Sequence, residues 1–380
     1  MAKDLFPSPH PLTPPHEEDD RLTWLRLLRS RRVGPATFFR MMSEHGSAAA
    51  ALDALPEVAA AAGVRDYTIC PEGVVLAEMK AGRLAGAELV GFGEDGYPDA
   101  LTDLSDAPPL LWVLGDRSLL ARPMVALVGA RNASSLGTRM ARKLAEGLGE
   151  AGYVVVSGLA RGIDAASHLA ALERGTVAVM AGGVDVFYPT ENAVLAQEIG
   201  EKGLRLSEQP PGLQPQARHF PQRNRIVSGL CRAVVVVEAA ARSGSLITAR
   251  NALDQGRDVL AVPGHPFDAR ASGCNMLIRD GGTLVRGAED VLEVLGSPRQ
   301  PATAAPEPDV KPAPPRSLSE MSALHDQILS RLGPSPVAED QLIRDLKLSA
   351  RDVAPELVNL ELDGRIVRQS GGLVALAVAT

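Results

Sequence analysis

The chain has 380 residues and a hydrophobic fraction of 45%, which is typical of a globular protein with roughly two or three domains. Three scattered cysteines (Cys70, Cys231 and Cys274) exclude a disulfide framework, and no apolar run reaches the ~20 residues of a membrane span, which predicts a cytoplasmic protein. The net charge of −7 argues against a basic surface over the whole molecule, although it leaves room for a local basic cluster.

The first part of the chain predicts a tail and then a helical domain. Residues 1–20 are rich in proline and lack an apolar signal sequence, which predicts a disordered tail. Residues 21–88 are rich in alanine and leucine at helical spacing. Within them, Arg29–Phe38 is similar to a helix–hairpin–helix, in which Gly34–Pro35 begins a helix whose free N–H groups hold a DNA phosphate. A plain corner between two helices explains the same pattern, so both interpretations stay open.

A sheet domain follows over residues 89–296. An irregular lead-in punctuated by glycine and proline precedes a valine-rich run at 124–129, an amphipathic helix and a second valine-rich run. This pattern is typical of a parallel βαβ unit, and its continuation predicts an α/β domain with a Rossmann-like, doubly wound, mainly parallel sheet. The predicted strands are 124–129, 153–157, 176–181, 204–208, 233–238, 258–262 and 283–285. The predicted helices begin near Ser134, Ile163, Glu191, Gln222, Ser243, Gly273 and Ala288.

The first turn of this sheet does not carry a dinucleotide fingerprint. Gly129-Ala130-Arg131 stands where G-x-G-x-x-G is expected, and a charged side chain sits where the backbone approaches a pyrophosphate. Ser157–Gly158 stands where a nicotinamide site has an acidic residue for the ribose. We therefore predict a phosphate-seeking pocket, with no cofactor and no metal.

The last part of the chain predicts a linker and a small domain. Residues 297–316 are rich in proline and alanine without periodicity, as in a flexible linker. Residues 317–380 have the order of a winged helix, with three helical patterns and a hairpin. The third helix carries Asp352, Glu356 and Glu361, which favours protein interaction or packing over the reading of a DNA duplex.

Four loops are expected to meet at the carboxyl edge of the sheet, where ligands of such folds bind. They begin after the predicted strands, and the third, from Gly212 to Arg225, is long for an α/β connection. The candidate DNA-binding residues in these loops are Arg131, Ser157, Gly158, Arg161, Gly212, Pro215, Arg218, Phe220, Arg223, Asn224, Arg225, Arg242, Ser243 and Gly244.

The third loop carries the most informative pattern. Phe220 stands among Arg218, Arg223 and Arg225 in a protein with only 3% aromatic residues, and single-stranded nucleic acid is held by cations on phosphates and rings under bases. The alternative is that Phe220 fills the core while the arginines pair with Glu238 or Asp254.

Catalytic groups are harder to find in this sequence. Cys274 with His265 upstream has the composition of a thiol nucleophile and base, although a buried structural cysteine explains Cys274 equally. The four loops lack paired carboxylates for acid–base catalysis.

Five ordered motifs resemble the DNA-processing family called DprA or Smf. They are SGLARGIDAASH from Ser157, FPQRNRIVSG from Phe220, SGSLITA from Ser243, VPG from Val262 and GCNMLI from Gly273, and the match extends over about 96–285. The layout of the flanks also matches, with a sterile-alpha-motif-like helical domain before the sheet and a winged helix after it.

The resemblance implies a protein that is not an enzyme. It implies binding of single-stranded DNA, protection of incoming DNA, and loading of the recombinase RecA in natural transformation and recombination, by a homodimer built on the Rossmann-like domain. By motif position, Arg131 would hold phosphate, Phe220 would stack a base, and the loops at Gly212 and Ser243 would cradle the backbone. Family members often have a basic residue at the position of Ala217, so whether Arg218 replaces it stays open.

An enzymatic alternative remains beside this interpretation. The predicted fold also resembles the nucleoside-monophosphate phosphoribohydrolases of the LOG type, whose phosphate loop reads P-G-G-x-G-T-x-x-E. Here residues 242–250 read RSGSLITAR, with Arg250 near the position of the catalytic glutamate.

Overall fold

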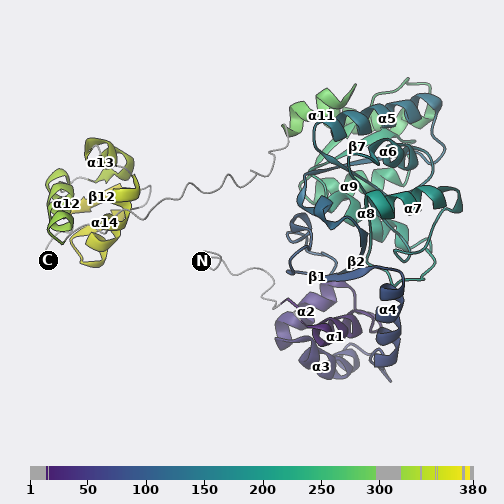
Figure 1. The fold of residues 1–380 in the computed structure, drawn as a ribbon, viewed down its shortest axis with the longest axis horizontal. Coiled ribbons are helices and arrows are strands. Elements are labelled where there is room, and N and C mark those ends of the chain that lie inside the picture. The colour runs from purple at the N-terminus through teal and green to yellow at the C-terminus, as the bar shows by residue number, and fades with distance from the viewer. Residues whose placement is uncertain are drawn as a thin grey trace. The chain divides into compact units, whose positions relative to one another are not determined.

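The structure is a computed structural model that describes residues 14–15, 17–296, 318–333, 336–346, 348, 350–369 and 373–376. It divides into two compact units, Met1–Pro301 and Ala302–Thr380 (Figure 1). The predicted linker at 297–316 and most of the predicted tail lie outside the described residues. Within the described chain, every helix is too short or too polar to cross a membrane.

The first unit combines a helical domain with a large sheet. Its helices are α1 Glu18–Leu28, α2 Pro35–His45, α3 Ala48–Ala61, α4 Glu72–Leu84, α5 Ser135–Glu150, α6 Ile163–Ala171, α7 Ala193–Lys202, α8 His219–Gly229, α9 Ser245–Asp254, α10 Ser272–Arg279 and α11 Ala288–Leu295. Its strands are β1 Glu88–Gly91, β2 Leu110–Gly115, β3 Met124–Gly129, β4 Val154–Ser157, β5 Thr176–Val179, β6 Leu204–Ser207, β7 Ala233–Glu238, β8 Asp258–Ala261 and β9 Thr283–Leu284.

The strand order of this sheet determines where a ligand can bind. The order is β1-β2-β6-β5-β4-β3-β7-β8-β9. From β3, the strands β4, β5 and β6 are added in turn on one side. The chain then returns to the other side of β3, where β7, β8 and β9 are added in turn. All these neighbouring strands are parallel. This confirms the expected doubly wound, mainly parallel sheet. The direction of building reverses between β3 and β7, and such sheets bind ligands beyond the carboxyl ends of the strands at that point.

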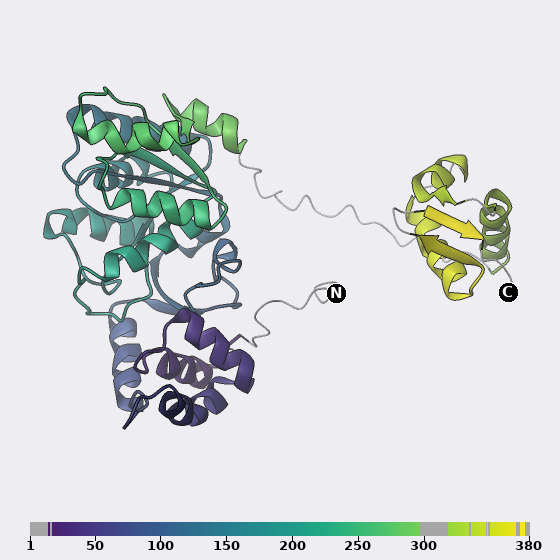
Figure 2. The same ribbon diagram turned by 180° about the vertical axis from the view of Figure 1, so that it is seen from behind.

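Both faces of the central strands are buried, which explains their valine-rich sequences. Val125 and Leu127 of β3 pack in one cluster with α5, α6 and α11, whereas Ala126 and Val128 pack in another with α8, α9 and α10. Figures 1 and 2 show this unit in two opposite views. Because burying a valine or leucine contributes about 1.5–3 kcal/mol, these runs are stable only between two helical layers.

Two strands in the lead-in were missed by the sequence analysis. β1 and β2 extend the sheet beyond β6, with antiparallel pairing of β1 to β2 and of β2 to β6. β1 has only four residues and β2 follows directly on Pro108–Pro109, so neither shows the pattern of an isolated strand.

The boundary expected for the tail at residue 20 is also wrong. Helix α1 already begins at Glu18, and a capping box between Glu17 and Asp20 stabilises its first turn. The preceding Pro15 is buried against Gly91, where a Cβ atom would lie 2.5 Å from the proline ring. This prolyl contact holds the start of the helical domain on the edge of the sheet.

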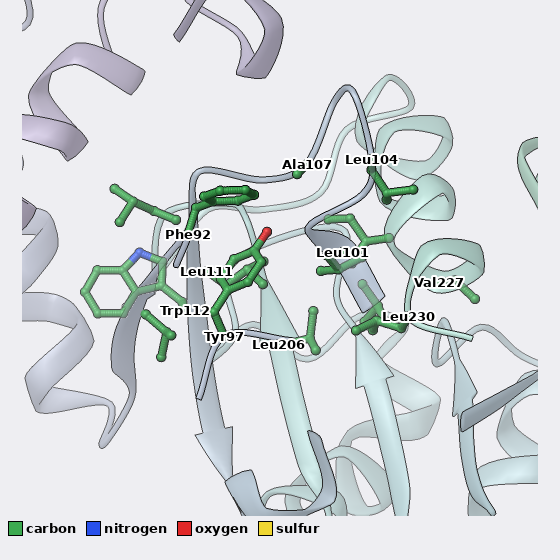
Figure 3. Close-up of a cluster of buried hydrophobic side chains, with 14 of the residues drawn as sticks. Phe92, Tyr97, Leu101, Leu104, Ala107, Leu111, Trp112, Leu206, Val227 and Leu230 are labelled. Atoms are coloured by element: carbon green, nitrogen blue, oxygen red, sulfur yellow. The ribbon is translucent and has the colours of Figure 1, made fainter. Parts of the chain in front are cut away.

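The lead-in also fixes the position of helix α8. Figure 3 shows Phe92 beside Tyr97, and Leu101 near Leu230 at the end of α8. The ring centroids of Phe92 and Tyr97 are 5.4 Å apart. A Cβ atom on Gly229, the last residue of α8, would lie 2.5 Å from the Leu104 side chain, so the helix and the lead-in pack in direct contact.

A second unit carries the C-terminal elements. It contains α12 Leu318–Arg331, α13 Glu339–Leu346 and α14 Ala350–Leu362, with strands β10 Val337–Ala338, β11 Ile366–Gln369 and β12 Leu373–Leu376 in the order β10-β12-β11. This confirms the expected winged helix, with β10 as an additional strand. Glu356 of the third helix is buried and lies 2.6 Å from His325 Nε2, so this carboxylate is a packing residue and not part of an acidic surface.

A buried carboxylate joins the helical domain to the sheet. Glu78 of α4 accepts hydrogen bonds from the Arg29 guanidinium at 2.8 and 2.9 Å and from the Trp112 indole N–H on β2 at 3.0 Å. The Glu78 side chain is 6% exposed, so its charge depends on these partners for stabilisation.

We predict that Arg29→Ala lowers the free energy of unfolding by about 3–5 kcal/mol, because it leaves the Glu78 carboxylate buried without its cation. Arg83→Ala is the matched control, since the Arg83–Glu18 ion pair has both side chains at least 60% exposed and should contribute little. Urea unfolding measures both variants. If Arg29→Ala loses no more unfolding free energy than Arg83→Ala, the Glu78 carboxylate does not depend on Arg29, and the Trp112 indole is sufficient to stabilise it.

Candidate nucleic-acid interface

A cavity of about 570 Å³ lies where the order of the strands reverses. The loops after β3, β4 and β7 and the first turns of α8 and α9 form its walls, and each of the four predicted loops contributes residues to it. We call it the larger cavity. The predicted residues that line it are Arg131, Gly158, Phe220, Arg223, Asn224, Ser243 and Gly244.

The third loop is shorter than the sequence indicates. Helix α8 begins at His219, before the expected start at Gln222, so Phe220 lies in its first turn. Pro221 obscured this start, although proline is tolerated in a first helical turn, where its missing N–H has no helical acceptor. The helical spacing then brings Phe220, Asn224 and Val227 to the same face, and all three line the cavity.

Arg225 lies on the other side of α8, away from both the cavity and its predicted role. Its guanidinium lies 2.5 Å from Glu208 and 3.4 Å from Asp106, and the side chain is 12% exposed. Ser157 is also misassigned as a ligand-facing residue. It is fully buried, and its hydroxyl donates a hydrogen bond of 2.7 Å to the Leu127 carbonyl. Both residues therefore hold the fold together.

Phe220 is the centre of an aromatic and cationic cluster. The guanidinium carbon of Arg131 lies 5.1 Å from the centroid of the Phe220 ring, and the Tyr188 ring lies 5.7 Å from it at an angle of 52°. Phe220 is partly exposed and belongs to none of the buried hydrophobic clusters of the described residues. The alternative in which it fills the core is therefore wrong.

Arg223 forms the floor of the larger cavity as a buried cation. Its Nη1 donates a 2.5 Å hydrogen bond to the Val179 carbonyl at the end of β5. Burial lowers the pKa of its guanidinium to about 10, and the nearby charge of Asp164 opposes this shift. A Cβ atom on Gly158 would lie 2.0 Å from Arg223 Nη1, so only glycine allows the arginine to pass beneath this loop.

Asp164 at the start of α6 completes the floor. Its carboxylate accepts hydrogen bonds from the backbone N–H groups of Gly158 and Ala160 at 3.2 and 3.3 Å. Burial raises its pKa, while the charge of Arg223 and the two N–H groups act in the opposite direction. The carboxylate therefore holds the loop after β4 against the cation below it.

The structure also explains why this sheet suits no dinucleotide. Glu238 at the end of β7 accepts hydrogen bonds from the Ser134 N–H at 3.0 Å and from the Ser134 hydroxyl at 2.5 Å. A carboxylate of the protein therefore occupies the start of α5, where the pyrophosphate of a dinucleotide would lie. Gly137 makes room for it, since a Cβ atom there would lie 2.2 Å from the carboxylate oxygen.

The start of α9 faces the larger cavity with small polar residues. The helix begins at Ser245, two residues after the expected start, and the Ser243 and Ser245 hydroxyls lie 2.7 Å apart. Asn224 of α8 donates a long hydrogen bond of 3.5 Å to the Gly244 carbonyl, which links the two helices at the cavity. Helix starts of this kind attract anions through their N–H groups.

The remaining predicted residues do not line the larger cavity. Gly212 donates its N–H to Asp185 at 2.7 Å, and Pro215 packs against Gly182, so this part of the loop is held by the sheet edge. Arg218 and Arg242 are exposed, and Arg161 lies beside Glu191 on the rim of a neighbouring, smaller cavity. Among the described residues, no carboxylate lies within 4.0 Å of the guanidinium of Arg131, Arg218 or Arg242.

The sequence analysis missed one aromatic residue at this site. Tyr188, in the segment after β5, is 45% exposed and contacts Phe220. Because aromatic residues make up only 3% of the chain, a tyrosine in a loop segment of the sheet domain is the signal that could have identified Tyr188. Cys274, by contrast, is fully buried, and burial raises the pKa of its thiol to about 11, so it is a structural cysteine.

A neutral histidine lies beneath the site. His168 of α6 is fully buried, and its Nδ1 lies 2.7 Å from the Thr176 hydroxyl, which itself donates to the Val155 carbonyl at 2.8 Å. Because the Thr176 hydroxyl proton is donated to the Val155 carbonyl, the hydroxyl oxygen can only accept from His168, so Nδ1 carries the proton and donates it. Burial and the charge of Arg223 lower the pKa of this imidazole to about 3.

Comparisons with known proteins cover most of the chain. Residues 88–296 match the family described as DNA recombination-mediator protein A, residues 18–81 a DprA-like N-terminal HHH domain, and residues 311–372 a DprA winged helix domain. The DNA processing protein DprA of Streptococcus pneumoniae is 50% identical over 201 residues, which are 52% of this chain and 71% of that protein. Protein Smf of Escherichia coli is 36% identical over 296 residues, 76% and 77% of the two chains.

Solved structures agree with these relatives. The structure of DprA from Streptococcus pneumoniae has a TM-score of 0.60 and 39% identity, and the match covers 71% of this chain and 97% of that one. A structure that concerns the single-stranded DNA binding mode of DNA processing protein A from Helicobacter pylori has a TM-score of 0.51 and 30% identity. That match covers 56% of this chain and 97% of the other.

The buried His168 predicts a specific dependence of stability on pH. The unfolded chain takes up a proton at this histidine near its ordinary pKa of 6.5, whereas the folded protein does so only near 3. The free energy of unfolding should therefore fall as the pH falls from about 6.5 toward 3, by about 1.4 kcal/mol per pH unit from this group alone. Urea unfolding of wild type and His168→Asn between pH 6.5 and 4 measures the difference in slope. Identical slopes would show that the folded protein protonates this imidazole normally.

Proposed function

Because this chain belongs to the DprA family of DNA-processing proteins, we propose that it binds single-stranded DNA in the larger cavity beside Phe220. The observation that carries the proposal is the partly exposed Phe220 ring with the Arg131 guanidinium on its face, at the place where a doubly wound sheet binds ligands. Among the described residues, no carboxylate lies within 4.0 Å of that guanidinium. A ring for bases beside a cation for phosphates is the combination that single-stranded nucleic acid requires. The Helicobacter pylori relative, whose structure concerns single-stranded DNA, supports the same ligand.

The phosphates would occupy the polar part of the cavity. Arg131, Asn224 and the start of α9 at Ser243–Gly244 line this part, with the buried charge of Arg223 beneath it. Arg218 and Arg242, both exposed, extend the positive surface beyond the cavity for the neighbouring phosphates. A base would stack on Phe220 once the Arg131 guanidinium moves from the ring to a phosphate.

The wider role follows from the family. We propose that the chain acts as a homodimer through the sheet domain, protects incoming single strands in the cytoplasm and loads the recombinase RecA onto them in transformation and recombination. Membership of the DprA family supports this role. We propose no enzymatic activity, because Arg250 on α9 stands near the position where a LOG-type phosphoribohydrolase has its catalytic glutamate.

A binding assay with matched oligonucleotides tests the proposed ligand. We expect tighter binding of a single strand than of the corresponding duplex, since a duplex offers phosphates but no free base for Phe220. We also expect the affinity to fall as salt rises, because bound phosphates release counterions. Fluorescence anisotropy over a salt series measures both. Equal affinities for single strand and duplex at physiological salt would contradict the proposal.

Two substitutions should weaken binding in different ways. Arg131→Ala should reduce the slope of log K against log salt by roughly 0.7, the contribution of one phosphate contact on a single strand. Phe220→Ala should cost roughly 1–3 kcal/mol of binding free energy with little change in slope, because the ring carries no charge.

Arg142→Ala is the control for the loss of one positive charge, since Arg142 is exposed on α5 and lines neither cavity. Its salt slope should equal that of the wild type. If Arg131→Ala keeps the wild-type slope as well, Arg131 does not contact a phosphate. If Phe220→Ala binds normally, the ring is not a stacking platform.

A further inference from the structure

A second cavity of about 220 Å³ adjoins the larger one. Arg131, Gly158, Ala160 and Phe220 line both, so the two cavities share a wall. The rest of the second cavity comes from the segment after β5, which contributes Tyr188 and its neighbours up to Glu191, and from the loop after β4. We call it the aromatic cavity, because Tyr188 and Phe220 both line it.

The Tyr188 and Phe220 rings contact each other at an inclined angle. Their centroids are 5.7 Å apart and the ring planes are inclined by 52°, so the rings touch without stacking on each other. Tyr188 is 45% exposed, and Phe220 is partly exposed, so each ring keeps free surface. Aromatic surface of this kind beside a cationic groove is what unstacked bases bind.

The charges of the two cavities differ. In the aromatic cavity the Arg161 guanidinium lies 3.5 Å from the Glu191 carboxylate, which offsets its charge. Arg131 lies on the wall that the two cavities share and has no carboxylate within 4.0 Å among the described residues. The larger cavity adds the buried Arg223 cation and the start of α9 at Ser243, neither of which lines the aromatic cavity. A phosphate is therefore favoured in the larger cavity, whereas the aromatic cavity suits an uncharged, planar group.

We propose that the aromatic cavity is a nucleobase subsite, in which one unstacked base lies against Tyr188 while the adjoining phosphate lies in the larger cavity. This inference rests on the proposed binding of single-stranded DNA and adds a second stacking ring to it. Tyr188 and Phe220 would then hold neighbouring bases on either side of their contact. Because stacking uses the face that every base has, the subsite should accept all four bases.

Substitution of Tyr188 tests the subsite by a loss of affinity that does not depend on salt. Tyr188→Ala should weaken the binding of a mixed-sequence single strand by about 5- to 150-fold with an unchanged salt slope, as for the loss of one stacked base. Tyr188→Phe keeps the ring and should bind like the wild type. The control is Phe267→Ala, which removes an aromatic side chain that is 94% exposed and lines neither cavity.

A reporter variant covers the case in which Tyr188→Ala fails to fold. Tyr188→Trp keeps a stacking ring, and its fluorescence should be quenched by a single strand but not by the same strand made of abasic sugar phosphates. The native Trp24 and Trp112 are each only 3% exposed and give a constant background.

The outcomes separate the two proposals. If the wild type fails to bind single-stranded DNA, the proposed function is wrong. If the wild type binds but Tyr188→Ala keeps full affinity, or the abasic strand quenches Tyr188→Trp as much as the normal strand, the nucleobase subsite is wrong and the proposed function stands.

Discussion

The burial of the Arg223 guanidinium beneath Gly158 is the contact on which the rest of the site depends. Through Nη1 the arginine ties α8 to the end of β5, and this sets the rotation of the helix that carries Phe220. The contact requires the missing Cβ atom of Gly158 and the charge of Asp164, which in turn holds the loop after β4. A buried cation is costly unless hydrogen bonds and an opposite charge compensate it, so these three residues form one unit. The packing of Leu101 and Leu104 of the lead-in against the end of α8 supports the helix from its other end.

An acidic protein can bind an anion when some of its arginines form ion pairs with carboxylates while others, near the binding site, do not. The arginines of this protein fall into these two groups. Arg29 and Arg225 are held by buried carboxylates at the junction between the helical domain and the sheet, where they stabilise the fold. Arg131 lines the larger cavity and has no carboxylate within 4.0 Å of its guanidinium among the described residues, and the same holds for the exposed Arg242. The net charge of −7 therefore says little about the ligand, because a phosphate responds to the local arrangement of charge within about one Debye length.

The sequence predicts the doubly wound sheet and the convergence of its loops, because buried parallel strands leave continuous valine-rich runs and their carboxyl ends meet at one edge. It predicts individual contacts less well. Phe220 and Arg225 differ by five positions in one basic segment, and only the early start of α8 shows that they face opposite sides. Ser157 is the last residue of β4, where a residue that contacts a ligand is expected, yet its hydroxyl faces the Leu127 carbonyl inside the sheet. Tyr188 was missed because nothing in its own segment indicates that Phe220, thirty-two positions later, lies against it.

In the proposed binding mode, the contact between Arg131 and Phe220 would account for selectivity as well as for affinity. In the free protein the guanidinium lies over the ring, a contact that contributes roughly 0.5–1 kcal/mol at an exposed site. A single strand bound as proposed would replace it with a phosphate for the arginine and a base for the ring, and the stacked base would contribute roughly 1–3 kcal/mol. A duplex supplies the phosphate, but its bases are already stacked on each other, so the ring loses its cation and gains no base. Under this proposal the same pair of side chains would favour single strands without any contact that reads the sequence of the DNA.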